Sequence, residues 1–176
     1  MNEKNVREAT RLSISNCHFQ KIAIEKIKSE FDTIVMMNVL EHVKNPVSFL
    51  SNARRLLAEG GRIIIMVPNA DSMNREIGRL IGAIKTNNEL ETSQIVLYGH
   101  RRVYNDKTLE RDIKRAKLRI IVRSRAMVKP FTCDQMESLM HRYGKEWMAK
   151  VIGALAVFGK KIPMKYHSHL HYVVGK

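Results

Sequence analysis

The stretch Phe31-Asp32-Thr33-Ile34-Val35-Met36-Met37-Asn38-Val39-Leu40 decides the fold of this 176-residue chain. It is almost continuously apolar, and its first half contains several β-branched side chains, which favour strands. A strand with one exposed face would alternate apolar and polar residues, so an unbroken apolar run is typical of a strand that is buried on both faces. The stretch therefore predicts a buried strand of a parallel sheet.

A helix and a second strand follow this strand directly. Asn45 can cap the helix, and Pro46 suits its first turn, where a backbone N–H has no intrahelical partner. Apolar residues then recur at helical spacing, and Gly60 can adopt the left-handed conformation that ends a helix. Residues 62–67 form the second buried run, which Pro68 stops. Strand, helix and strand with short links predict a βαβ unit with a right-handed crossover and parallel strands.

The flanking residues continue the alternation of helices and strands. On the N-terminal side, the pattern predicts a helix capped by Asn2 and a short strand at about 17–22. On the C-terminal side it predicts helices at 76–85, after Asn105, at 134–143 and at 145–158, a polar loop at 86–92, and strands at 118–125 and 167–174. We expect an α/β fold with a Rossmann-like doubly wound sheet.

We expect one partial domain across the whole chain. Its parts are residues 1–30 as a helix and short strand, 31–70 as the βαβ core, 71–104 as a loop and helix insertion, and 105–176 as the C-terminal strands and helices.

The charge of the chain is large and uneven. The formal net charge is +14; residues 101–176 hold 18 lysines and arginines against 6 acids, whereas residues 1–100 hold 13 against 11. Such a basic part can attract nucleic acid, acidic lipid or a phosphorylated substrate, or it can be only a solvated surface. The basic run from Arg111 to Arg125 has few interleaved aromatic residues, which argues against base stacking.

Cysteine content and hydropathy exclude several classes of protein. Cys17 and Cys133 give no disulfide framework and no paired metal spacing. The first ten residues are polar and charged and do not resemble a signal peptide. The longest apolar run near the C-terminus, 151–158, is too short to span a bilayer. We therefore expect a cytoplasmic protein without a membrane span.

Several short motifs together resemble one group of enzymes. They are the strand and turn that end in Glu41-His42-Val43, the helix start Asn45-Pro46, the segment from Leu56-Leu57 to Gly60-Gly61, Val67-Pro68-Asn69, and Gly99-His100-Arg101-Arg102-Val103-Tyr104. In this order they resemble the fourth strand, the next helix and the fifth-strand region of class I S-adenosylmethionine-dependent methyltransferases. The type 11 and type 23 group is the most similar, and the resemblance runs from about residue 31 to the C-terminus.

The resemblance implies S-adenosylmethionine as the cofactor. Its methionine part would lie against Met37 and Asn38 at the strand end, with Leu40 and Glu41 on the turn beyond. Ligands of open parallel sheets bind beyond the carboxyl ends of the strands, which indicates the same place. The glycine-rich loop and ribose-binding acid of the family would come earlier, but no glycine precedes Gly60. We therefore expect an N-terminally truncated chain in which an inner strand pairs on one side only.

Three residues are candidates for catalysis. His42 stands at the mouth of the expected cleft, where an imidazole can act as a general base or can simply order the turn. His100 and Arg101 lie in a loop that can grip a carboxylate or phosphate, or can be anchored to nearby carbonyls. Some relatives have Glu-x-x-Glu-His here and can use it for a divalent metal, but Asn38 replaces the first acid, so we expect no metal site.

The sequence thus predicts a methyltransferase-family protein that acts on an unknown small-molecule or biopolymer acceptor. Methyl transfer depends mainly on an in-line approach in a site that excludes water. We expect the truncated chain to be inactive alone and to need a second polypeptide or self-association to complete its sheet. The alternative is a non-enzymatic module whose basic part binds nucleic acid or a partner.

Overall fold

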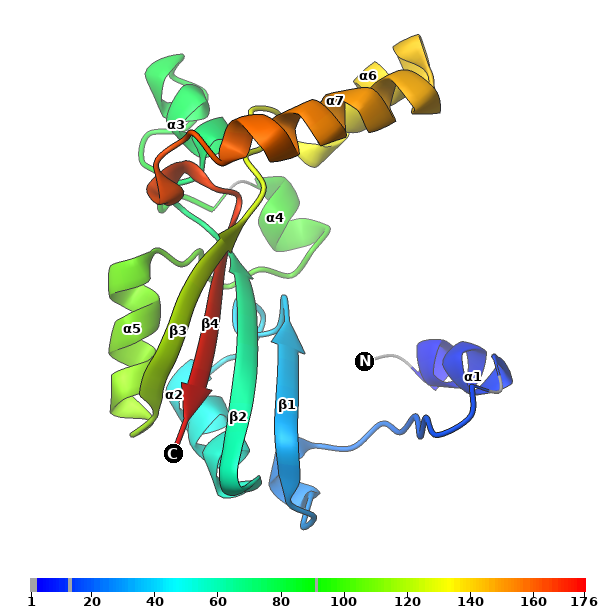
Figure 1. Ribbon diagram of the computed structural model, residues 1–176, viewed down its shortest axis with the longest axis vertical. Helices are drawn as coiled ribbons and strands as arrows, with labels where there is room; N and C mark the ends of the chain where they lie inside the picture. Colours follow the sequence, from blue (N-terminus) through cyan, green and yellow to red (C-terminus); the bar gives the residue numbers. More distant parts are fainter. Residues whose placement is uncertain (1–2, 13, 91) are drawn as a thin grey trace.

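The computed structural model describes residues 3–12, 14–90 and 92–176. Its centre is a four-stranded sheet with the order β1-β2-β4-β3 (Figure 1). The strands are β1 (Phe31–Met37), β2 (Leu57–Pro68), β3 (Arg119–Ala126) and β4 (His169–Gly175). The helices are α1 (Glu3–Arg11), α2 (Pro46–Arg55), α3 (Met73–Leu80), α4 (Thr92–Val96), α5 (Asp106–Arg115), α6 (Cys133–Tyr143) and α7 (Lys145–Gly159), with 3-10 turns η1 (Ile24–Lys26) and η2 (Met164–Tyr166). The alternation of helices and strands is that of the expected α/β fold.

Two helices begin where the sequence predicts. The Asn45 side chain accepts a hydrogen bond from the Ser48 backbone N–H at 3.0 Å, and Pro46 is the first residue of α2. At α5, the Asn105 side chain accepts from the Thr108 N–H at 3.0 Å, and the Thr108 hydroxyl accepts from the Asn105 N–H at the same distance. These contacts satisfy N–H groups that have no partner inside the helix.

The sheet contains both the predicted parallel pair and an antiparallel strand. β1 and β2 are parallel and are connected through α2, which confirms the βαβ unit. β4 is antiparallel to both of its neighbours, β2 and β3. β1 lies at an edge and, among the described residues, pairs only with β2. This position agrees with the expectation that the strand pairs on one side.

The start of β2 differs from the prediction. We expected Gly60 to end the helix, but α2 ends at Arg55. Leu57 already pairs with Phe31, so the strand begins before the glycine and continues through it. Gly60 keeps a left-handed φ of +71° within the strand. Pairing across the sheet therefore overrides the local helix-ending signal.

One face of the sheet packs against α2 and α5 and forms the core (Figure 1). Its strand residues are Met36, Leu57, Ile63, Ile65, Val67, Leu170, Tyr172 and Val174, and its helix residues include Leu50, Ala53, Leu109 and Ile113. The prediction that β1 is buried on both faces is wrong, because Val35 and Met37 on its other face are 57% and 51% exposed. No described helix covers that face.

The N-terminal region also departs from the predictions. Residues 17–22 are exposed and form no strand, because no described strand lies beside them to pair with their backbone groups. α1 stands apart from the sheet and buries none of its residues (Figure 1). Its predicted cap, Asn2, lies outside the described residues. The sequence also did not predict α4, whose first residue ends the expected polar loop.

Candidate functional site

The site begins where β1 leaves the sheet. Asn38 has a left-handed φ of +53°, and its N–H donates to the Met66 carbonyl at 2.9 Å. Asparagine tolerates this conformation better than most residues do, so the chain can turn sharply here. Met37, the last strand residue, remains half exposed at the tip. The tip is the carboxyl end of a parallel strand, the place where ligands of open α/β sheets bind.

The turn after Asn38 is held from two sides. The Leu40 side chain is fully buried in the core, so it supports the turn from below. The Arg102 guanidinium donates to the Leu40 carbonyl at 2.8 Å and to the Lys44 carbonyl at 3.2 Å, and it also reaches the Val43 carbonyl. Arg102 therefore fixes the turn, which is the anchoring alternative that the sequence left open for this loop, although the sequence did not indicate which residue of the loop would do it.

The segment that carries Arg102 runs along the ends of β1 and β2. It starts at Gly99, which has a φ of +67°. The Arg101 N–H donates to the Glu41 carbonyl at 2.8 Å, and Tyr104 forms a parallel bridge with Asn69, just after β2. These backbone contacts hold the loop at 99–104 against the turn at 38–43.

Three of the predicted site residues meet as a result. The ligand atoms of Glu41, His42 and His100 all lie within 4.8 Å of one another. The two imidazoles are in edge contact, with ring centroids 4.8 Å apart and planes at 75°. His42 Nε2 lies 3.9 Å from Glu41 Oε1. We call Glu41, His42 and His100 the tip cluster.

The tip cluster contains buried polar atoms that lack a partner. Glu41 is 1% exposed, and within the described residues neither of its carboxylate oxygens has a hydrogen-bond partner. His100 Nδ1 is also buried and unpaired within that set. Burying such groups costs free energy, so a native structure normally supplies a partner or a ligand. The two groups therefore make the tip cluster a candidate site for a ligand.

Burial also shifts the protonation of the tip cluster. Burial raises the pKa of Glu41, although the neighbouring His42 acts in the opposite direction. Burial lowers the pKa of His100, and the charges of His42 and Arg75 act in the same direction. The cluster thus combines a neutral imidazole with a carboxyl group that resists ionisation. It can accept a proton, hold a cationic group, or offer three ligand atoms to a metal ion.

The remaining predicted residues take different positions. Arg101 is exposed beside the cluster and contributes its backbone, not its side chain, to the turn. The Leu40 side chain points into the core, so only its backbone faces the turn. Met37 is the last residue of β1, and Asn38 begins the turn that leads to Glu41.

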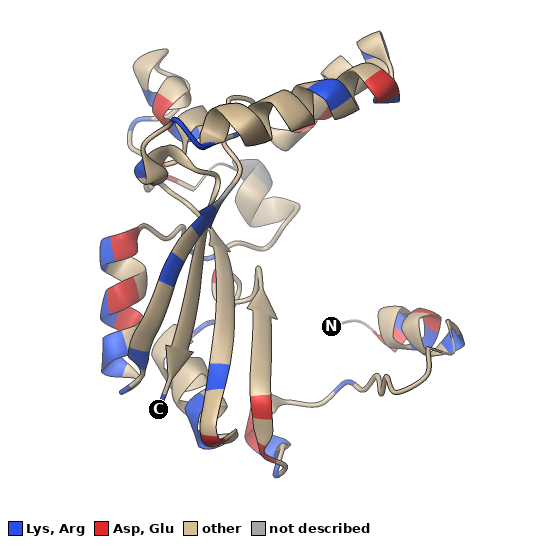
Figure 2. Cartoon of the chain, in the orientation of Figure 1, with Lys and Arg blue, Asp and Glu red and all other residues tan. Residues whose placement is uncertain are grey.

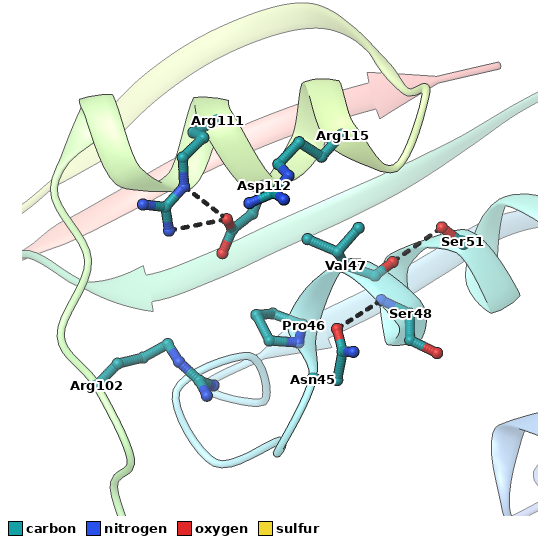
Figure 3. Close-up of a pocket in the computed structure, with 9 residues that line it drawn as sticks. All are labelled: Asn45, Pro46, Val47, Ser48, Ser51, Arg102, Arg111, Asp112 and Arg115. Atoms are coloured by element: carbon teal, nitrogen blue, oxygen red, sulfur yellow. Dashed lines mark hydrogen bonds and ion pairs between the residues drawn. The ribbon is translucent and has the colours of Figure 1, made fainter.

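A separate pocket of about 600 Å³ opens between α2 and α5 (Figure 3). Its lining residues are Asn45, Pro46, Val47, Ser48, Ser51, Arg102, Arg111, Asp112 and Arg115. Several polar groups there already have partners: Asn45 caps α2, Ser51 bonds the Val47 carbonyl at 2.9 Å, and Asp112 pairs with Arg111 at 3.0 Å. No tip-cluster residue lines this pocket.

Residues 3–122 match the model of a family described as a methyltransferase domain. The chain belongs to this methyltransferase domain family. The match covers the βαβ unit, the tip cluster and the first half of β3. No curated protein matches the sequence.

Solved methyltransferase structures share the fold of this domain. One is an S-adenosylmethionine-dependent methyltransferase from Mesorhizobium loti, with a TM-score of 0.61 and 11% identity over 99% of this chain and 77% of that one. The plantazolicin methyltransferase BamL, solved with a triazolic desmethylPZN analogue and SAH, has a TM-score of 0.57 and 14% identity over 98% of this chain and 64% of that one. The mycolic acid cyclopropane synthase CmaA1, solved with SAH and CTAB, has a TM-score of 0.56 and 12% identity over 99% and 67%. At these identities the likeness establishes the fold.

Proposed function

We propose that this methyltransferase domain uses S-adenosylmethionine and transfers its methyl group to an acceptor that loses a proton to the tip cluster. The observation that carries this proposal is the pair of unpaired buried groups, the Glu41 carboxyl and His100 Nδ1, at the carboxyl end of β1. Two of the similar structures contain SAH. When bound, S-adenosylmethionine supplies an electrophilic methyl group on a positively charged sulfur.

Glu41 suits a positively charged ligand. Its carboxyl group is buried without a hydrogen-bond partner among the described residues, and a nearby cation would favour the ionised form that burial disfavours. Met37 and Asn38 border the same tip, and the core packing of Leu40 keeps the turn in position. Glu41 would therefore anchor the cofactor, with Met37 and Asn38 beside it.

His100 suits the role of proton acceptor. Because its pKa is lowered, its imidazole is neutral near pH 7, and Nδ1 has no competing partner among the described residues. A neutral imidazole can remove the proton from a hydroxyl, amine or carboxylic acid as that group attacks the methyl carbon. The edge contact with His42 orients the ring. The exposed Arg101 would attract acceptors that carry a carboxylate or phosphate.

Calorimetry with S-adenosylmethionine tests the anchoring role of Glu41. We expect Glu41→Gln to weaken binding at least about tenfold, since a hydrogen bond to a charged group contributes about 1.5–3 kcal/mol. The exposed Glu30→Gln is the matched control and should bind like the unmodified chain. An unmodified chain that binds no cofactor would overturn the proposal.

The pH dependence of stability separates lost binding from misfolding. Because the pKa of Glu41 is raised in the fold, its favourable contribution is present at low pH and is lost as pH rises through the folded pKa. Without ligand, Glu41→Gln should therefore melt at a higher temperature than the unmodified chain at pH 8, with little difference at pH 4. A lower melting temperature at pH 8 would mean that the carboxylate has a structural partner.

Radiolabelled methyl transfer tests His100. With a panel of phenols, amines and carboxylic acids, His100→Asn should keep cofactor affinity within about twofold and lose most transfer, since general-base catalysis contributes about 10²–10⁴-fold. The residual activity should rise with pH, because the acceptor must then ionise without help. Equal loss of binding and transfer would assign His100 to the cofactor instead.

The edge of β1 supports a second part of the proposal, namely completion of the sheet by another chain or a second copy. Among the described residues, β1 pairs on one side only, and Phe31 and Val35 are 41% and 57% exposed. Unpaired apolar edge strands readily associate. Sedimentation over a range of concentrations tests this: a monomer at all concentrations would contradict it.

A further inference from the structure

The α6–α7 hairpin, residues 133–159, lies outside the region that matches the methyltransferase family. It joins the end of β3 to the segment before β4 and projects beyond the sheet (Figure 1). His169 at the start of β4 pairs with Pro68 at the end of β2, so the hairpin leaves from the same end of the sheet as the tip cluster. A surface that binds the hairpin would therefore lie near the end of the sheet that carries the tip cluster.

α7 is unusually apolar for an exposed helix. Of its 15 residues, Lys145–Gly159, only Met148 and Gly159 are buried. Trp147, Ile152, Val157 and Phe158 are 39%, 41%, 63% and 50% exposed. A helix that is apolar on most sides is normally buried in a protein core or in lipid. The described residues leave this helix without such cover, which marks an interaction surface.

Basic residues flank this apolar helix. Residues 142–165 contain one acid, Glu146, and six basic residues, which are Arg142, Lys145, Lys150, Lys160, Lys161 and Lys165. All six are exposed: Arg142 lies near the end of α6, Lys145 and Lys150 lie in the first half of α7, and Lys160, Lys161 and Lys165 follow α7. Figure 2 shows this distribution of basic residues along the hairpin. Long basic side chains can keep their charge in the headgroup layer while their stems lie along apolar surface. Tryptophan also favours this boundary, because its ring is apolar and its N–H is polar.

The length of α7 fits a helix that lies on a bilayer. Fifteen helical residues extend about 22 Å, less than the hydrocarbon thickness of roughly 30 Å. No helix in the described ranges is both long and apolar enough to cross a membrane. Apolar side chains combined with basic flanks are typical of helices that bind anionic lipid surfaces.

We propose that the α6–α7 hairpin binds the surface of anionic lipid bilayers, with the apolar side chains of α7 inserted and its flanking lysines at the headgroups. Binding there would turn the tip-cluster end of the sheet toward the lipid. The proposal does not depend on methyl transfer, so Glu41→Gln should bind lipid like the unmodified chain.

Trp147 is the only tryptophan of the chain, so its fluorescence reports directly on the hairpin. The full chain is titrated with vesicles of phosphatidylcholine and phosphatidylglycerol in a 3:1 ratio, and with vesicles of phosphatidylcholine alone. We expect a blue shift with the anionic vesicles at a lipid concentration at least about tenfold lower than with the neutral ones, because several lysines contribute. Brominated acyl chains should quench the emission if the ring is inserted.

Paired variants separate insertion from charge. Val157→Asp with Phe158→Asp should abolish the blue shift, and Lys160→Glu with Lys161→Glu should weaken binding at least about tenfold. The matched controls are Leu12→Asp, at a side chain that is 68% exposed, and Lys107→Glu with Lys114→Glu on α5. The controls should bind within about twofold of the unmodified chain. Circular dichroism melts check that every variant is folded.

Three outcomes would overturn the proposal. Equal binding to neutral and anionic vesicles would remove the role of the lysines. Binding without a blue shift or quenching would mean charge attraction alone, without insertion. A tryptophan emission that depends on protein concentration in the absence of lipid would assign the hairpin to a contact between copies of this chain.

Discussion

Both faces of β1 and β2 carry apolar side chains, but the surroundings of the two faces differ. On the face toward α2 and α5, Ile63 and Ile65 of β2 are fully buried. On the opposite face, Ile64 of the same strand is only partly buried, and Val35 beside it in β1 is 57% exposed. Side-chain type therefore does not determine burial here; the presence of a covering layer does. The buried face holds the fold together, and the open face is available to be covered.

Paired substitutions in β2 give the largest expected difference between the faces. Ile65→Ala should lower the free energy of unfolding by about 2–5 kcal/mol, because it leaves a cavity in a closed core. Ile64→Ala removes the same atoms from the open face and should cost less than half as much. Urea unfolding of both variants measures the difference. Equal losses would mean that the open face is covered in solution.

The local parts of this fold are those that the sequence predicts well. Asn45 and Asn105 cap their helices through residues three positions away, so the signal lies within one turn. The prediction of a strand at 17–22 is wrong, because a strand forms only where a second strand, distant in sequence, pairs with it. The apolar run at 62–67 could not reveal that one of its faces lacks a covering helix.

The candidate site was predictable as separate pieces and not as an assembly. Glu41-His42 was recognisable as a polar pair beyond a strand end, and His100 as part of a polar loop before a helix. Their meeting depends on Arg102, which bonds the turn carbonyls about 60 positions earlier in the chain. No local pattern distinguishes a clamping arginine from its exposed neighbour Arg101. The unpaired state of the Glu41 carboxyl also follows only from three-dimensional packing.

Removal of the Tyr172 hydroxyl, on the buried face, should cause the next largest loss of unfolding free energy. The Tyr172 hydroxyl has one proton to donate, and it lies 2.5 Å from an Asp106 oxygen and 3.0 Å from a Glu110 oxygen on α5, so the two carboxylates share this donor and the sheet is linked to the helix. Tyr172→Phe keeps the ring packing and leaves these carboxylates without that donor, which should cost about 1–3 kcal/mol. Urea unfolding measures the loss, and Tyr143→Phe on the exposed α6 is the control. An unchanged stability would mean that Arg123 and Arg125 alone satisfy the carboxylates.

Two histidines on the open face should make stability depend on pH, with a smaller effect. Burial lowers the pKa of His169, helped by Lys129 and His171, and burial lowers the pKa of His171, helped by Arg125. The unfolded chain therefore binds protons more readily, so the stability is complete above about pH 6.5 and is lost as pH falls through the folded pKa values. Thermal melts from pH 8 to 5 should show a decline that His169→Gln with His171→Gln reduces. The exposed His18→Gln should leave the decline unchanged.

The smallest change in stability is expected at Val35, in the middle of the open face. Val35→Thr keeps the β-branched shape and adds a hydroxyl that reaches solvent, so the free energy of unfolding should change by no more than about 0.5 kcal/mol. The same change should reduce any self-association, because it removes an apolar contact from the surface that another chain would cover. Urea unfolding at low protein concentration and sedimentation at high concentration separate the two effects. A loss above about 1 kcal/mol would mean that Val35 is buried in the folded chain and that the two faces differ less than their exposure indicates.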